Sequence, residues 1–167
     1  MAIKKIHKEI YERTQPPTDY LKYWRVIRRW VKAKHNLGNQ DLEMLLFLYS
    51  EIYFNKDKFN EYNQLMSWNK KRFTNLLTDG WIRVFRTKRK NETTLYELSY
   101  KGRRTIGEVY KKLSGEEFAE TEKHNPMFRP RAPYTDVVFR NYIRKINMSI
   151  RKQRRDIQNQ TSPEDDL

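Results

Sequence analysis

The chain has 167 residues, of which 37% are hydrophobic and 14% aromatic, enough for one folded domain with an arm or for two very small units. Lys and Arg outnumber Asp and Glu by 35 to 21, which gives a formal net charge of +14 at pH 7 and predicts a polyanionic partner. The absence of Cys excludes disulfides, thiolate metal sites and thiol catalysis.

Catalysis and metal binding find little support in the sequence. His7, His35 and His124 are far apart, and no metal-ligand spacing occurs among them. No N-terminal apolar stretch resembles a signal peptide, and no run approaches the ~18–20 apolar residues of a membrane span. We therefore expect a non-enzymatic, soluble protein with no metal, cofactor or membrane partner. Its expected location is the cytoplasm (the host-cell cytoplasm or nucleoid if the protein is phage-encoded).

Two helices are predicted before residue 36. Ile3, Ile6 and Ile10 recur at helical spacing and define an N-terminal helical arm over 1–17 that stops at its two prolines. A second helix is predicted from residue 18 to His35. Its apolar stripe consists of Tyr20, Tyr23, Trp24, Ile27, Trp30 and Val31.

Three helices follow in quick succession. The segment NQDLEMLLFLYSEIYF (39–54) is apolar almost all round, which predicts a helix in the middle of the domain. A short helix is expected over 57–67. Ser67 offers an N-cap for a third helix, which Gly80 stops. The inward residues of this third helix are predicted to be Phe73, Leu76 and Leu77.

A β-hairpin is predicted next, because 81–89 and 93–100 are rich in β-branched and aromatic residues and are separated by a polar turn. Both faces of the predicted strands carry arginine, so the sequence does not decide which face of the hairpin turns toward the core. After Ser99 a helix resumes and ends at Gly115. The order of elements over 18–115 is that of a winged helix-turn-helix domain, a mostly α fold with a small β-hairpin wing (α+β) and additional terminal helices.

The C-terminal third is predicted to hold a linker and one long helix. Residues 116–133 contain prolines and mixed charge and are expected to be a linker, 134–158 a basic helix, and 159–167 an acidic tail. The helix carries a heptad-like apolar seam. Three interpretations of it are open: pairing with a second copy or with the N-terminal arm, contact of its arginines with DNA, and packing on its own domain. The seam consists of Phe139, Ile143, Ile146 and Ile150.

The helix over 67–79 has the character of a recognition helix. If its apolar residues face the core, its other side carries groups suited to a major groove, and no acidic residue occurs before Asp79. Arg reaches guanine, Asn reaches adenine, and Lys and Thr reach phosphates. The predicted contacts in this helix are Lys71, Arg72, Thr74, Asn75 and Thr78.

The wing, 83–97, concentrates positive charge at its tip with only Glu92 to offset it. Such a tip is favourable beside a phosphate backbone. The alternative is a solvated turn in which Lys discourages edge-to-edge aggregation. The predicted wing contacts are Arg86, Lys88, Arg89 and Lys90, and weaker candidates for phosphate contacts are Arg28, Arg29, Arg103 and Arg104.

The stretch SWNKKRFTNLLTDGWIRVFR, followed by LYELSYKGRRTIGEVYKKL (67–113), resembles the MarR-type winged helix-turn-helix transcription regulators. The resemblance lies in Leu76, the helix-ending Gly80, the apolar pair Trp81-Ile82 and the run LSYKGR at 98–103. It implies a recognition helix at 67–79, a wing at 83–97 and a homodimer built from terminal helices. The wing lacks the Asp of the family's Asp-x-Arg motif, which braces the hairpin.

Together these features predict a double-stranded DNA-binding transcription regulator. The first alternative is an architectural or virion-associated DNA-binding protein with the same fold. The second is a winged-helix module that binds protein or RNA in a larger assembly. Many members of the family bind a small-molecule effector, and the aromatic helix at 20–31 would line its pocket. Core packing is the favoured explanation of that stripe, so the sequence does not support an effector.

Overall fold

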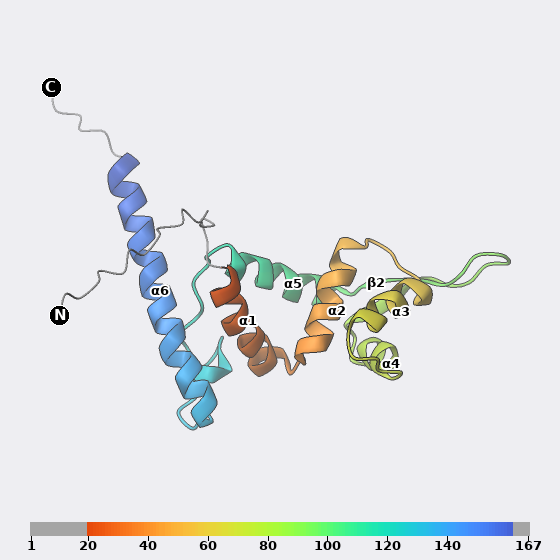
Figure 1. Ribbon diagram of the computed structural model, residues 1–167, viewed down its shortest axis with the longest axis horizontal. Helices are drawn as coiled ribbons and strands as arrows, with labels where there is room; N and C mark the ends of the chain where they lie inside the picture. The colour runs from red at the N-terminus through yellow and green to blue at the C-terminus, as the bar shows by residue number, and fades with distance from the viewer. Residues whose placement is uncertain (1–19, 162–167) are drawn as a thin grey trace, which may run out of the picture.

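The computed structural model describes residues 20–161, which form six α-helices, one short 3-10 turn and one antiparallel hairpin (Figure 1). This confirms the predicted mostly α fold with a small β-hairpin. The predicted arm at 1–17 and the end of the acidic tail lie outside the described residues. The elements are α1 (Tyr20–His35), α2 (Asn39–Ser50), α3 (Lys56–Leu65), α4 (Arg72–Thr78), β1 (Ile82–Arg86), β2 (Leu95–Leu98), α5 (Tyr100–Leu113), η1 (Pro126–Phe128) and α6 (Tyr134–Thr161).

The molecule is elongated, with α1, α2 and α5 between two different ends (Figure 1). α3, α4 and the hairpin form one end, and the long α6 forms the other. α1 packs on α5, and its predicted stripe is buried at Tyr23, Ile27 and Trp30, whereas Tyr20 is exposed. Apolar burial therefore holds the two ends together through the central helices.

α2 is less buried than its composition predicts. Leu42, Leu45 and Leu48 are fully buried, but the side chains of Phe47 and Tyr49 are each 42% exposed. The helix ends at Ser50 because the following chain extends toward the hairpin. There Phe54 exchanges two backbone hydrogen bonds with Tyr96, of 3.0 and 2.8 Å. This single bridge adds a third, one-residue strand beside β2.

Residues 116–133 are packed against the domain and do not form the free linker that their composition predicts. Phe118 and Met127 are buried, and Asn147 of α6 holds this segment in place. Its side chain accepts from the backbone N–H of Phe118 and donates to the carbonyl of the same residue, each at 2.9 Å. A polar residue inside the apolar face of α6 thus satisfies backbone groups that burial would otherwise leave unpaired.

The predicted dimer seam of α6 is covered by the same chain. Ile143, Ile146 and Ile150 are 0–4% exposed, and Phe139 is partly buried against the core. The interpretation in which these residues pair with a second copy is therefore wrong, and packing on the chain's own domain is correct. Within residues 20–161, no helix combines the length and the apolar character needed to cross a bilayer.

We expect Gly102→Ala to destabilise the protein, because Gly102 lies where α5 touches the base of the hairpin. A Cβ at this position would lie 2.6 Å from the carbonyl oxygen of Trp81. Relieving that overlap should lower the free energy of unfolding by about 1–3 kcal/mol. The measurement is urea unfolding followed by circular dichroism.

Gly107→Ala is the matched control, since Gly107 is in the same helix and a Cβ there would meet nothing within 4 Å. This change should be neutral or stabilise by up to ~1 kcal/mol through helix propensity. Equal effects of the two substitutions would contradict the close approach of α5 to the hairpin.

Candidate nucleic-acid interface

One side of α4 is exposed and polar. Lys71, Thr74, Asn75 and Thr78 are exposed to solvent, while Leu76 is buried in the core. The opposite side is anchored by Phe73, which meets other aromatic rings edge-on. The face that is free to meet a partner carries amide, hydroxyl and ammonium groups and no carboxylate.

Arg72 does not belong to that exposed face, and its prediction as a groove contact is wrong. The residue is 2% exposed, and its guanidinium group lies among α2, α3 and the turn before α4. It donates to Asp41 at 3.1 Å, to Gln40 at 2.7 Å and also to Asn63. A fourth acceptor is the carbonyl of Ser67, at 3.2 Å. With Phe73, Leu76 and Leu77 facing the core, helical spacing puts Arg72 on the flank of α4. From there its side chain turns inward and holds α4 against α2 and α3.

α4 begins later than predicted, at Arg72, and Ser67 does not cap it. The side chain of Asn69 accepts from the backbone N–H of Lys71 at 2.9 Å, which forms a local turn before the helix. Such turns compete with helical hydrogen bonds. This turn leaves Trp68, Asn69 and Lys70 exposed beside α4, and the signal for it is the asparagine itself. Gly80 ends the helix with φ +74°, as its position predicts.

The wing is a two-stranded hairpin with a long basic tip. Arg86 forms an ion pair with Glu92 at 3.0 Å, so one predicted wing cation is already neutralised within the wing. Lys88, Arg89 and Lys90 are exposed and have no ion-pair partner within the described part of the chain. The tip therefore presents three uncompensated positive charges over three consecutive residues.

The base of the hairpin is braced by a buried carboxylate. Glu97 is 6% exposed and accepts from Arg83 at 2.6 Å and from Arg103 of α5 at 2.6 Å. A buried carboxylate with two guanidinium partners is strongly favoured over a lone one. Glu97 thus joins β1, β2 and α5, although the wing lacks the Asp expected from the resemblance. Arg103, a candidate for phosphate contact, keeps half of its side chain exposed despite this role.

The other three candidates for phosphate contacts also have partners in the chain. Arg28 lies 4.0 Å from Glu43, and Arg104 lies 3.6 Å from Glu108. Arg29 donates to the buried Asp136 and ties α1 to α6, so it serves as a structural contact at the far end from α4. Of the four candidates, Arg103 is the one that contacts the hairpin, through Glu97 of β2.

His35 connects α1 to the hairpin through edge-on ring contacts with Trp81 and Trp30. Burial lowers the pKa of His35, and the positive charge of Lys34 lowers it further. Burial of Glu108 raises the pKa of its carboxyl, but the hydrogen bond and charge of Lys34, together with the charges of His35 and Arg104, outweigh burial and lower this pKa overall. The imidazole is therefore neutral near pH 7, which suits its position between two indole rings.

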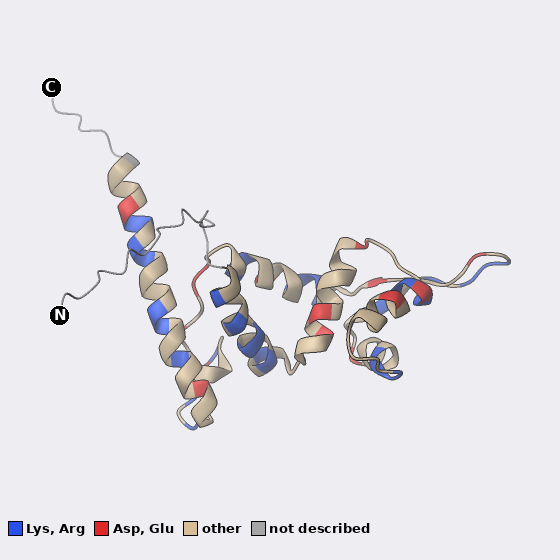
Figure 2. Cartoon of the chain, viewed as in Figure 1, with Lys and Arg blue, Asp and Glu red and all other residues tan. Residues whose placement is uncertain are grey.

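α4 and the wing lie at the same end of the molecule, opposite α6 (Figure 1). Figure 2 shows Lys and Arg on both of them, and the tip extends beyond the body of the domain. The polar face of α4 is not covered by any other described segment. One helix and one basic hairpin at the same end of the molecule are therefore both accessible to an extended polyanion.

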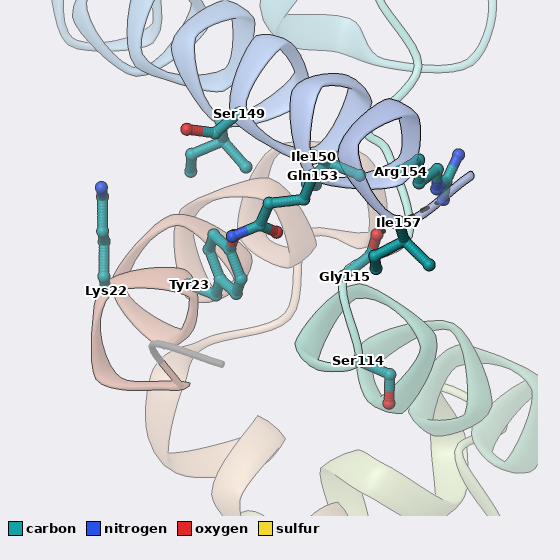
Figure 3. A pocket seen from close by; sticks show the side chains of 10 residues that line it. Lys22, Tyr23, Ser114, Gly115, Ser149, Ile150, Gln153, Arg154 and Ile157 are labelled. Carbon is teal, nitrogen blue, oxygen red and sulfur yellow. Dashed lines mark hydrogen bonds between the residues drawn. The ribbon is translucent and has the colours of Figure 1, made fainter. Parts of the chain in front are cut away.

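Small ligands find less support than a polyanion. No group of His, Asp and Glu within residues 20–161 is arranged to hold a metal ion. A hollow of about 340 Å³ lies between the start of α1, the end of α5 and α6 (Figure 3). Gln153 points across it toward Tyr23, and aliphatic side chains line its other wall. Tyr23 itself is buried, so the aromatic stripe of α1 belongs mainly to the hydrophobic core.

The chain matches no family model, no curated protein and no solved structure.

We expect Arg72→Ala to lower the free energy of unfolding by about 2–4 kcal/mol, because it removes a buried guanidinium group together with its hydrogen bonds to four acceptors, one of which, Asn63, is itself buried. Lys71→Ala changes the adjacent exposed side chain and should stay within about 0.5 kcal/mol of the wild type. The measurement is equilibrium unfolding in urea. Equal stability of the two variants would contradict the anchoring role of Arg72.

Proposed function

We propose that the protein is a double-stranded DNA-binding transcription regulator of the MarR-like winged helix-turn-helix type. The observation that carries the proposal is the exposed, carboxylate-free face of α4 at the same end of the molecule as the uncompensated cations of the wing tip. A surface with one recognition helix and one basic hairpin suits a duplex, in which the helix enters the major groove and the hairpin follows the backbone or minor groove.

The two parts of this surface have different roles in the proposal. Asn75 is exposed and carries the amide group that can pair with adenine, and Thr74 is beside it. Lys71 and Thr78, at the two ends of α4, reach phosphates. The wing tip, Lys88 to Lys90, neutralises phosphates without reading sequence. Arg72 supports the proposed role of Asn75 indirectly, because the buried contacts of Arg72 fix the orientation of α4 and so the direction in which Asn75 points.

The resemblance also implies a homodimer, and we retain two copies on two half-sites as part of the proposal. The contact between copies must use residues other than Ile143, Ile146 and Ile150, since these are buried within the chain.

An architectural DNA-binding protein is the main rival, because the same surface would also bind DNA without sequence preference. A protein- or RNA-binding module is the second rival. It is favoured by an exposed pair of stacked rings, Tyr53 between α2 and α3 and Phe85 of β1, with centroids 4.1 Å apart. Selection of bound fragments from random duplexes, followed by affinity measurement, distinguishes these functions.

We expect duplex affinity to fall steeply with salt. The four cations proposed to contact phosphates, Lys71 and Lys88 to Lys90, predict a slope of log K against log salt between roughly −3 and −4. A regulator should bind its selected site at least ~10³-fold more tightly than a scrambled duplex. Tight binding with equal affinity for both duplexes would indicate an architectural protein, and no duplex binding would contradict the proposal.

Asn75→Ala and Lys88→Ala should separate base reading from backbone contact. Asn75→Ala should reduce the preference for the selected site at one or two base pairs, with a loss of about 1–3 kcal/mol. Lys88→Ala should weaken all duplexes alike and reduce the salt slope by about 1. Fluorescence anisotropy on selected and scrambled duplexes at several salt concentrations measures both effects. Identical behaviour of the two variants would contradict this division of roles.

A further inference from the structure

A second surface at the α6 end has a composition unlike that of the DNA-binding end. A groove of about 610 Å³ runs between α1 and α6, and we call it the α1–α6 groove. Its lining combines large apolar side chains with three cations and contains no carboxylate. The lining residues are Leu21, Lys22, Arg25, Val26, Val138, Phe139, Asn141, Tyr142 and Lys145.

The apolar side chains of the groove are unusually open to water. Leu21 is 83% exposed, Val138 is 48% exposed and Tyr142 is 36% exposed. Met148, three residues after Lys145 on α6, is 65% exposed. A contiguous apolar patch with a polar rim is typical of a surface that another molecule covers.

The rim of the groove is positively charged. Neither Arg25 nor Lys145 has an ion-pair partner within residues 20–161. The groove continues along α6 into a second hollow of about 500 Å³ that also contains Lys152 and Arg155. From Val138 to Arg155 the helix extends for about 26 Å at 1.5 Å per residue, roughly the length of a five-turn helix.

We infer that the α1–α6 groove is a docking site for an acidic amphipathic helix of another protein. The apolar side of such a helix would cover Leu21, Val138 and Tyr142, and its carboxylates would pair with Arg25 and Lys145. A helix laid in a groove is a common mode of peptide recognition. This inference does not depend on the proposed DNA binding, because it concerns the opposite end of the molecule.

Charge argues against two of the occupants that the chain itself could supply. A second copy that used the same patch would bring two copies of one cationic surface together, because a two-fold interface uses the same patch on both subunits. The N-terminal segment 1–17 also carries more positive than negative side chains, namely Lys4, Lys5, Lys8 and Arg13 against Glu9 and Glu12. Both would bring like charges together in the groove.

The shape and apolar content of the surface argue against a membrane or nucleic acid. A concave groove between two helices does not fit the plane of a bilayer as a protruding apolar face does. DNA-binding surfaces are more polar and more cationic than protein-binding ones, whereas here exposed Leu, Val and Tyr side chains separate the cations. An acidic amphipathic helix would fit the concave shape of the groove and would match its apolar and cationic side chains.

The test is a selection from a random library of displayed peptides of about 18 residues, long enough for roughly 27 Å of helix. The full chain is the bait. We expect enriched peptides to combine Asp and Glu with apolar residues at helical spacing. Synthetic copies of them should bind the full chain and become helical on binding, as circular dichroism would show.

Three variants locate the binding. Arg25→Glu with Lys145→Glu should weaken the selected peptides at least about tenfold, and Leu21→Gln should do so as well. Leu21 is so exposed that its substitution leaves the core intact. The matched control is Lys88→Glu with Lys90→Glu at the wing tip, which makes the same change in net charge and should leave the peptide affinity unchanged.

A charge-reversed peptide, with Lys in place of its Asp and Glu, should prefer the Arg25→Glu, Lys145→Glu protein over the wild type. The inference is overturned if no such peptide is enriched, or if the wing-tip control weakens binding as much as the groove variant does. It is also overturned if sedimentation shows a dimer that Leu21→Gln dissociates. Binding of the protein to phosphatidylglycerol vesicles or to a DNA duplex also overturns the inference, if Leu21→Gln abolishes that binding and the wing-tip control does not.

Discussion

The buried guanidinium of Arg72 is the contact on which the proposed DNA-binding surface depends. It joins α2, α3 and the turn before α4 through Asp41, Asn63 and Gln40. Because α4 has only seven residues, it has little helical stability of its own, and its orientation comes from tertiary contacts. Glu97 performs the equivalent task for the wing, since its two arginine partners connect both strands to α5. Each exposed functional element thus rests on a buried ionic anchor.

The distribution of charge divides the molecule into two functional ends. Many cations of the central helices and of α6 are paired: Arg29 with Asp136, Lys34 with Glu108, and Arg151 and Arg154 with Glu117. These ion pairs neutralise part of the positive charge of α1 and α6. Cations without an ion pair among residues 20–161 include Lys88 to Lys90 at the wing tip and Arg25 and Lys145 at the α1–α6 groove, and these two surfaces differ in their apolar content. The first suits a duplex, and the second suits an acidic helix of a protein. A regulator with both would connect a DNA site to a partner.

The order of the elements was predictable from local signals, and the identity of the partners was not. Ser99 accepts from the backbone N–H of Gly102 as an N-cap, and Gly80 and Gly115 adopt positive φ at helix ends, as their positions predict. The spacing of Ile143, Ile146 and Ile150 correctly identifies an apolar face, but periodicity does not say whether the same chain or another covers it. Arg72 was misplaced for a related reason, because its acceptors come from elements 9 to 32 residues away in sequence. Composition made 116–133 look like a linker, and only the long-range contact with Asn147 reveals that it is packed.

The absence of Cys makes cross-linking the most direct test of the central claim that the exposed face of α4 and the wing tip contact one duplex. Single cysteines introduced as Thr78→Cys and Arg89→Cys would carry a photo-cross-linker, with Lys123→Cys, an exposed position between α5 and η1, as the control. The account predicts that the first two positions cross-link to the same selected duplex and that the control does not. Cross-links from the control alone, or from only one of the two predicted positions, would contradict it.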